Sequence, residues 1–258
     1  MKKLIALMLA LVMVLALAAC GGEKAPANTD TPAPSDNAPA GNEEVKVMTN
    51  AEFVAADLDT AVVVETAIQA YESWWDGEID LYCQDETGAY YVYGVKCTED
   101  EAKAFVPGAK VRVSGFKAAW DGEVEIIDAK VEVLEGTYIH ETATDVTALM
   151  GTDALEAEMN KLVAVKGLTV AASKNAAGED VPYLYKWDGS GAQGDDLYFN
   201  VSLGEATYTF TVNAYMNDTA DVYAAVEGLK IGDKIDVEGF LYWYNGAQPH
   251  LTSVTPAA

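Results

Sequence analysis

Apolar and polar residues alternate along several short stretches of this chain, and each such stretch predicts a β-strand. In the clearest example, Val111 and Val113 fall on one side of the strand, while Lys110, Arg112 and Ser114 fall on the other. The same alternation, rich in branched and aromatic residues, predicts four more strands in this half of the chain, at 62–70, 79–84, 89–95 and 123–133.

Short helices are predicted between some of these strands. Thr98-Glu-Asp-Glu101 has the spacing of a capping box, which predicts a helix that runs to about Phe105. Residues 50–56 predict an earlier helix with Asn50 as its cap. The elements therefore follow the order strand, strand, strand, helix, strand, strand.

One stretch of the chain occurs twice without a gap. Gly108-Ala-Lys-Val-Arg-Val-Ser-Gly-Phe116 precedes Trp120-Asp121-Gly122, and Gly232-Asp-Lys-Ile-Asp-Val-Glu-Gly-Phe240 precedes Tyr244-Asn245-Gly246. The spacing from the first glycine to the last is the same in both copies. A repeat of this length predicts that one small β domain occurs twice.

The second half of the chain repeats the predicted order of elements. A helix at 153–159 precedes a first strand at 162–170, and a later helix begins at Asn217 or Asp218 and ends near Val226. The remaining strands are predicted around 196–198, 208–212, 232–240 and 248–254. Bulges are predicted at Gly167 and, in the first half, where the apolar phase slips between residues 126 and 127.

The order of elements resembles that of the OB-fold, a five-stranded Greek-key barrel with a helix between strands three and four. An Asp85-Glu-Thr-Gly88 turn and a Gly-x-Lys-Val-x-Val-x-Gly strand, both common in bacterial OB domains, strengthen the resemblance. It implies a mainly β protein with two tandem OB-like barrels. This fold hosts many functions, so the fold alone predicts none.

The N-terminus has the pattern of an export signal. Lys2 and Lys3 precede an unbroken apolar run at 4–18, which is shorter than the roughly 20 residues of a membrane-spanning helix. Leu17-Ala18-Ala19-Cys20 resembles the lipobox of bacterial lipoproteins. The resemblance implies a lipid on Cys20 and a protein anchored to the cell membrane, facing outside the cytoplasm. The alternative is an ordinary signal peptide with a chance cysteine.

These patterns divide the chain into five parts. Residues 21–44 are rich in Pro, Ala, Asn, Asp and Gly and predict a disordered linker. The predicted boundaries are 1–19 for the signal peptide, 20–44 for the lipidated cysteine and linker, 45–135 for the first barrel, 136–160 for a connector with a short helix, and 161–258 for the second barrel.

The acidic composition limits which molecules the protein is expected to bind. The formal net charge is −25, from 16 Lys and Arg against 41 Asp and Glu. Such a surface repels phosphates and anionic headgroups, so nucleic acid is a disfavoured partner.

The chain has two cysteines besides Cys20, namely Cys83 and Cys97. If the hairpin turn lies at residues 86–87, Cys83 faces about Tyr91, several residues from Cys97. Two buried thiols are therefore expected rather than a disulfide.

Aromatic turn motifs are the candidate binding elements. Trp-Asp-Gly or Tyr-Asn-Gly occurs four times, once between strands one and two and once between strands four and five of each barrel. In OB-folds these loops flank the usual binding face. The resemblance therefore predicts two aromatic platforms, one formed by Trp74, Trp75 and Trp120, the other by Tyr185, Trp187, Trp243 and Tyr244. Tyr82 and Tyr90, expected to face outward, could extend the first platform.

The sequence predicts a binding protein rather than an enzyme. It holds only two histidines, and it contains no nucleophile motif, His pair or phosphate loop. No cofactor is expected, and no metal either, because the acidic loops lack the calcium-loop spacing. The predicted ligand is a glycan, a small molecule or a protein partner. The alternatives are a structural role in which the aromatics only pack the barrels and, more weakly, single-stranded nucleic acid binding.

Overall fold

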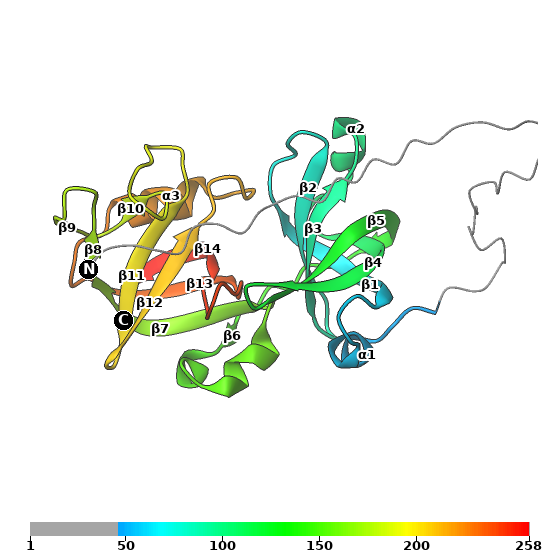
Figure 1. Cartoon of the computed structure of the whole chain (residues 1–258), viewed down its shortest axis with the longest axis horizontal. Helices are drawn as coiled ribbons and strands as arrows, with labels where there is room; N and C mark the ends of the chain where they lie inside the picture. Colours follow the sequence, from blue (N-terminus) through cyan, green and yellow to red (C-terminus); the bar gives the residue numbers. More distant parts are fainter. Residues whose placement is uncertain (1–45, 258) are drawn as a thin grey trace, which may run out of the picture. The chain divides into compact units, whose positions relative to one another are not determined.

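The structure is a computed structural model that describes residues 46–257, and it contains two β-barrels joined by a connector (Figure 1). The first is a closed barrel with the strand order β1-β2-β3-β5-β4. β3 runs parallel to β5, and the other strand pairs are antiparallel, as in an OB-fold. Its strands are β1 (Ala61–Tyr71), β2 (Glu78–Gln84), β3 (Ala89–Lys96), β4 (Ala109–Trp120) and β5 (Glu123–Thr137).

The second barrel repeats this topology. β12 runs parallel to β14, and pairing of β11 with β7 closes the sheet. Its main strands are β7 (Leu162–Ala171), β11 (Leu197–Leu203), β12 (Ala206–Val212), β13 (Lys234–Phe240) and β14 (His250–Pro256). Short strands lie beside them, namely β6 (Thr144–Asp145), β8 (Ser173–Lys174), β9 (Asp180–Val181) and β10 (Leu184–Tyr185). The predicted pair of OB-like barrels is confirmed.

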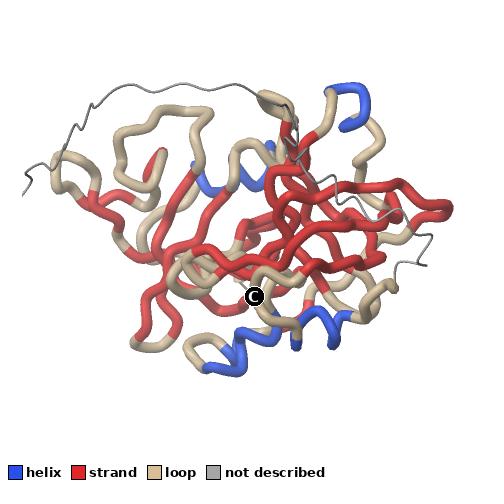
Figure 2. Tube along the Cα trace, turned by 45° about the vertical axis from the view of Figure 1, so that its right-hand side comes forward, coloured by secondary structure: helices blue, strands red, loops and turns tan. Residues whose placement is uncertain are grey.

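The helices are short and sit between or before the barrel strands (Figure 2). α1 (Asn50–Ala55) precedes β1, α2 (Glu99–Ala102) lies between β3 and β4, and α3 (Ala220–Glu227) lies between β12 and β13. The connector holds two 3-10 helices, η1 (Thr147–Leu149) and η2 (Asp153–Glu158), where an α-helix was predicted at 153–159.

Two of the predicted helix caps are wrong by one residue or two. Thr49, not Asn50, caps α1, because Glu52 stands three residues after it and completes a reciprocal capping box. α3 begins after Thr219 rather than at Asn217 or Asp218. The predicted capping box of Thr98 and Glu101 is confirmed in α2.

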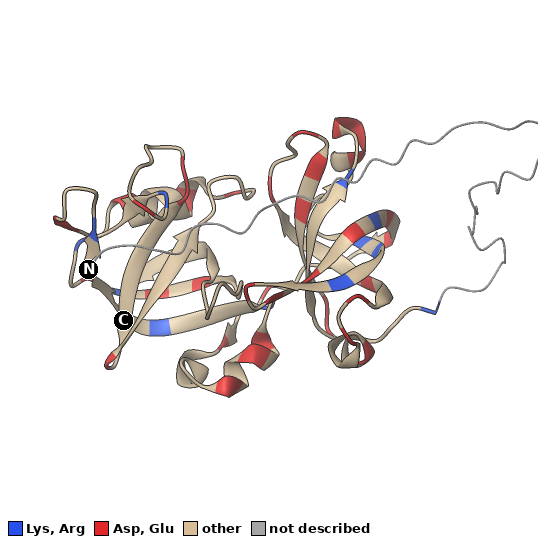
Figure 3. Ribbon diagram, in the orientation of Figure 1, with Lys and Arg blue, Asp and Glu red and all other residues tan. Residues whose placement is uncertain are grey.

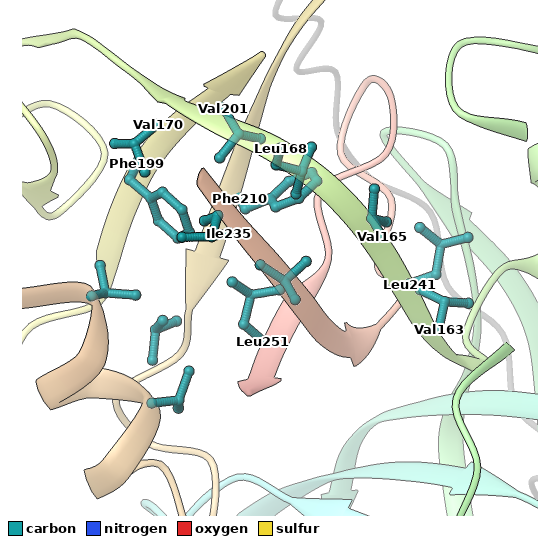
Figure 4. Close-up of a cluster of buried hydrophobic side chains, with 14 of the residues drawn as sticks. Val163, Val165, Leu168, Val170, Phe199, Val201, Phe210, Ile235, Leu241 and Leu251 are labelled. Atoms are coloured by element: carbon teal, nitrogen blue, oxygen red, sulfur yellow. The ribbon is translucent and has the colours of Figure 1, made fainter. Parts of the chain in front are cut away.

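Each barrel encloses its own apolar core. Val111 and Val113 are fully buried in the first core, as their alternation with polar neighbours predicts. The second core is built around Phe199 and Phe210, whose ring centroids lie 6.4 Å apart (Figure 4). The predicted bulge at Gly167 of β7 is present, with a φ angle of 69°. The bulge predicted between residues 126 and 127 of β5 lies just after residue 127, where Asp128 takes a φ angle of 49°.

The repeated glycines Gly115 and Gly239 lie where neighbouring strands approach closely. A Cβ on Gly115 would lie 2.6 Å from the carbonyl oxygen of Ile127. A Cβ on Gly239 would lie 2.4 Å from the carbonyl oxygen of His250. These contacts are with backbone atoms, so relieving them requires a shift of the strand. This packing explains why the second glycine of the repeated motif occurs in both copies.

The predictions for the N-terminal segment fall outside the described residues, whereas those for Cys83 and Cys97 can be compared with the structure. The signal peptide, Cys20 and the linker to residue 44 lie outside residues 46–257. Cys83 and Cys97 are free thiols, the first buried and the second half-buried. No helix within the described range is long and apolar enough to cross a membrane.

Alanine at either close-approach glycine should destabilise the protein. Gly115→Ala and Gly239→Ala should each lower the free energy of unfolding by about 1–3 kcal/mol, the usual range for overpacking. Gly228→Ala is the matched control, because its Cβ would meet its nearest atom at 3.4 Å. Urea denaturation followed by circular dichroism measures the difference. Equal stability of all three variants would contradict the packing described here.

Candidate functional site

The two barrels belong to one compact unit and are joined by backbone hydrogen bonds in two places. At the first, Ser73 N–H donates to Tyr215 O over 2.7 Å, and Asn217 N–H donates to Tyr71 O over 2.9 Å. At the second, Asn245 N–H donates to Asp121 O over 2.8 Å. The loop after β1 and the turn after β4 therefore each contact the second barrel.

An apolar cluster fills the space between these two contacts. It contains Ala70, Tyr82 and Tyr91 from the first barrel and Met216 and Phe240 from the second. The rings of Tyr82 and Phe240 have centroids 5.0 Å apart. The junction is therefore a packed interface, and the alternative that some aromatics pack the barrels together holds for this subset.

A hydrogen-bonded chain crosses the junction beside the cluster. The Tyr82 hydroxyl lies 2.7 Å from Glu72 Oε1 and 2.6 Å from His250 Nδ1. The Tyr82 hydroxyl donates to Glu72, and the His250 tautomer sets which atom donates in the contact between Tyr82 and His250. Burial lowers the pKa of His250 to about 3, and the imidazole is therefore neutral.

A groove with a cavity volume of about 680 Å³ opens at this junction. Residues from both barrels line it, including Tyr93 and Trp120 from the first and Trp187, Tyr198 and Tyr244 from the second. Trp120, Trp187 and Tyr244 are 53%, 69% and 43% exposed. The rings of Trp120 and Tyr244 have centroids 5.4 Å apart, so the two barrels present neighbouring ring faces.

Burial raises the pKa of several carboxyl groups at the junction. Burial first, and then the charge of Asp80, raises the pKa of Glu72 to about 7. Burial also raises the pKa of Glu123 to about 8, although Trp243 N–H donates to its Oε2 over 2.7 Å. The pKa values of Asp80 and Asp196 are raised by burial as well. The groove is thus less negative at neutral pH than the acidic residues of both barrels suggest (Figure 3).

The structure divides the predicted binding residues among three places. Trp120, Trp187 and Tyr244 line the groove. Trp74 and Trp75 do not, but they line an adjoining cavity of about 370 Å³ that shares Glu72, Asp80 and Tyr93 with it. Trp243 packs against the second core beside another surface cavity. Tyr185 also packs against that core and donates to Glu227 over 2.7 Å.

The prediction that Tyr82 and Tyr90 extend an exposed platform is wrong. Both side chains are only 2% exposed, Tyr82 in the junction and Tyr90 in the first core. A four-residue loop pairs Gln84 with Ala89 and hence Cys83 with Tyr90, not with Tyr91. Tyr90 therefore shares the inner face of the barrel with Cys83, whereas Tyr82 lies on the outer face and is covered by the second barrel.

The sequence analysis did not identify the junction residues, because their contacts form only between the two barrels. Glu72, His250 and Tyr242 lie on different barrels or different strands, and Tyr242 stacks on His250 with centroids 4.3 Å apart. One sequence signal did point here. Asp80-Leu-Tyr82 recurs as Asp196-Leu-Tyr198, and both aspartates line the groove.

Stability should fall as pH rises from about 6.5 to about 8. Glu72 and Glu123 have folded pKa values of about 7 and 8 against an ordinary 4.5, so the folded state binds more protons than the unfolded state in this window. His250 has the opposite effect only below its ordinary value of 6.5, where the unfolded state binds its proton. Each bound proton corresponds to about 1.4 kcal/mol per pH unit.

Melting temperatures measured across this window test the assignment. Glu123→Gln should flatten the decline and raise the melting temperature at pH 8, because the variant has no charge to bury. Glu86→Gln, an exposed carboxyl in the β2–β3 turn, is the control and should keep the decline. A melting temperature that rises with pH in the unmodified chain would contradict the proposed burial of protonated carboxyls.

Comparisons with known proteins give structural likeness only. No protein-family profile matches the chain, and no curated protein matches it in sequence. A murine DNA-binding protein bound to double-stranded DNA is similar in structure, with 13% identity, a TM-score of 0.32 and coverage of 77% of this chain and 100% of that one. At such identity the likeness concerns the fold alone.

Two further solved structures are similar to the same degree. The HINa domain of Ifi202 in complex with 20-base-pair double-stranded DNA has 12% identity and a TM-score of 0.34, and the match covers 78% of this chain and 98% of that one. A Replication Protein A heterotrimer bound to single-stranded DNA has 10% identity and a TM-score of 0.31, and the match covers 80% of this chain and 51% of that one.

These findings correct the predicted ligand. The prediction placed a glycan, a small molecule or a protein partner first and disfavoured nucleic acid, whereas the similar structures are DNA complexes. The physical error lay in the use of a charge summed over the whole chain. Burial raises the pKa of Glu72, which lines the groove, to about 7, so the formal charge overstates the repulsion inside the groove.

Proposed function

We propose that this chain binds single-stranded nucleic acid through its bases, in the groove between the two barrels, without catalysis. The observation that carries the proposal is the set of exposed rings, Trp120, Trp187 and Tyr244, gathered along one groove from both barrels. Large apolar side chains this exposed gain free energy when a flat partner covers them. The groove therefore suits stacking of unpaired bases.

The dimensions of the groove agree with this role. Its volume of about 680 Å³ lies in the range of sites that enclose ligands of several rings. Trp120 and Tyr244 are tilted by 36° to each other, so a base can stack on either ring. Stacking of a base on an aromatic side chain contributes about 1–3 kcal/mol and tolerates any base.

The phosphates are expected to contribute little. Among the described residues that line the groove, Lys174 is the one Lys or Arg. Proteins that hold the backbone through many basic residues lose affinity steeply with salt. With few phosphate contacts, the binding proposed here should depend only weakly on salt, and protonation of Glu72 below a pH of about 7 should favour it.

Loss of a groove tryptophan should weaken binding to single strands. Trp120→Ala and Trp187→Ala should each lower the affinity for a fluorescein-labelled 12-nucleotide strand about 5- to 100-fold, from the stacking energy that each ring contributes. Fluorescence anisotropy with the 45–258 fragment measures this at 50 and 200 mM salt. Trp75→Ala, which removes an exposed ring outside the groove, is the matched control and should bind normally.

Two results would overturn the proposal. The first is the absence of binding at low salt and at a pH of about 6, where repulsion is weakest. The second is equal loss of affinity in all three tryptophan variants, which would place the strand elsewhere on the surface.

We also propose that the protein acts at the cell membrane, held there by a lipid on Cys20 and facing outside the cytoplasm. The support is the basic start, the short apolar run and the Leu17-Ala18-Ala19-Cys20 ending, which resembles a lipobox. More than one acyl chain on Cys20 would make the attachment stable rather than marginal. The groove would then meet nucleic acid outside the cell.

Labelling of expressing cells with an alkyne fatty acid tests this location. The full-length chain should take up the label and sediment with membranes, and Cys20→Ser should remove both properties. Cys97→Ser is the control, because Cys97 lies in a folded barrel and should leave the label unchanged. A soluble, unlabelled product from the unmodified chain would contradict the lipid anchor.

A further inference from the structure

The duplication allows the same place to be compared in the two barrels. Asp80 and Tyr82 of β2 correspond to Asp196 and Tyr198, at the start of β11, in the repeated Asp-Leu-Tyr. On the neighbouring strand, Tyr82 pairs with Tyr91, whereas Tyr198 pairs with Thr211. A threonine in the second barrel therefore stands where the first barrel has a tyrosine.

In the first barrel both oxygens of the aspartate are hydrogen-bonded. Gly94 N–H donates to Asp80 Oδ1 over 2.6 Å, and the Tyr91 hydroxyl donates to Asp80 Oδ2 over 3.0 Å. The Tyr91 ring also packs against Tyr82, with centroids 5.1 Å apart. This corner of the first barrel is closed and its polar groups are satisfied.

In the second barrel the same corner is left incomplete. Ala214 N–H donates to Asp196 Oδ1 over 2.8 Å, but within residues 46–257 no group donates to Asp196 Oδ2. The Thr211 hydroxyl is buried and also has no partner in this part of the chain, although the side chain is only 2% exposed. A buried hydroxyl without a partner is costly and marks a place where a ligand can supply the missing bond.

A smaller side chain stands at this corner of the second barrel, beside the groove. Threonine lacks the phenol of tyrosine, and Asp196, Tyr198 and Thr211 all line the groove. A ring bound here would occupy the space that corresponds to the Tyr91 phenol, with its polar edge toward Asp196. The two unpaired groups would then lie at the edge of the ring rather than at its face.

The chemistry of this corner selects among bases. Asp196 Oδ2 is an acceptor whether or not the other oxygen carries a proton, so it needs a donor. Cytosine, adenine and guanine each carry an exocyclic amino group that donates, and carboxylates are known to accept from the cytosine amino group. Thymine and uracil place a carbonyl oxygen at the corresponding position, which would face the carboxyl oxygen without a proton between them.

We propose that Asp196 and Thr211 form a seat for one unpaired base with an exocyclic amino group, so that the groove prefers cytosine or adenine strands over thymine or uracil strands. Asp196 accepts from the amino group, and the Thr211 hydroxyl donates to the neighbouring ring nitrogen. The proposal rests on the proposed function and names the bases that the same groove selects.

A steric test uses the arrangement found in the first barrel. Thr211→Tyr should fill the seat with a phenol that can reach Asp196, so the variant should fold normally and bind a 12-nucleotide cytosine strand at least about tenfold more weakly, as expected for a lost base contact. Thr207→Tyr is the matched control, because Thr207 lies on the same strand, exposed and outside the groove. Melting curves of both variants show whether each is folded.

A chemical test uses homopolymer strands. The unmodified 45–258 fragment should bind 12-nucleotide cytosine and adenine strands about tenfold more tightly than the thymine strand. In Asp196→Asn, Ala214 N–H holds the amide oxygen at the Oδ1 position, so an NH2 donor replaces the Oδ2 acceptor, and the cytosine-to-thymine ratio should come close to one. Asp195→Asn removes the same charge from the neighbouring position outside the groove and should leave the ratio unchanged.

The outcomes separate this inference from the proposed function. Equal binding of all strands, with Thr211→Tyr as tight as the unmodified fragment, overturns the seat but keeps the groove as a binding site. A preference that survives in Asp196→Asn also overturns the assignment. If no strand binds to any variant, the proposed function itself is wrong.

Discussion

The structure depends on the contact between two copies of one barrel, and the Tyr82 hydroxyl stands at its centre. It donates to Glu72 on its own barrel and lies within hydrogen-bond distance of His250 Nδ1 on the other. Burial lowers the pKa of His250 and raises that of Glu72, so both side chains favour their uncharged forms, although Glu72 also lines the groove. The groove exists because this contact, together with the backbone bonds at Tyr71 to Ser73 and at Asp121, holds the exposed rings of both barrels side by side.

Duplication followed by divergence accounts for the asymmetry of the site. The cores and the close-approach glycines Gly115 and Gly239 are equivalent in both copies, since both barrels need them to close. The residues at the junction are not equivalent. Tyr91 donates to the aspartate at its corner of the first barrel, whereas the buried Thr211 hydroxyl makes no such bond at the matching corner. One copy therefore supplies more of the packing surface, and the other supplies more of the polar edge of the groove.

The sequence predicts most of the fold because its signals are local. Alternation in Val111 and Val113, the capping box at Thr98 and the repeated glycines each depend on a few neighbouring residues. The site is harder to predict, because it depends on contacts between distant segments. Trp120 and Tyr244 are found through their turn motif, but the burial of Tyr82 follows from its contact with the second barrel. The protonation of Glu72 and Glu123 likewise follows from burial, which a count of formal charges does not include.

The most direct measurement is the response of the five tryptophan indole N–H signals in a ¹H–¹⁵N NMR spectrum of the 45–258 fragment, titrated with a 12-nucleotide cytosine strand. Binding in the groove predicts that the signals of Trp120 and Trp187 shift together, while that of Trp75 stays in place. Because Trp120 and Trp187 belong to different barrels, their joint response would show that one groove spans the junction. A shift confined to Trp75, or no shift of any indole signal, would contradict the account.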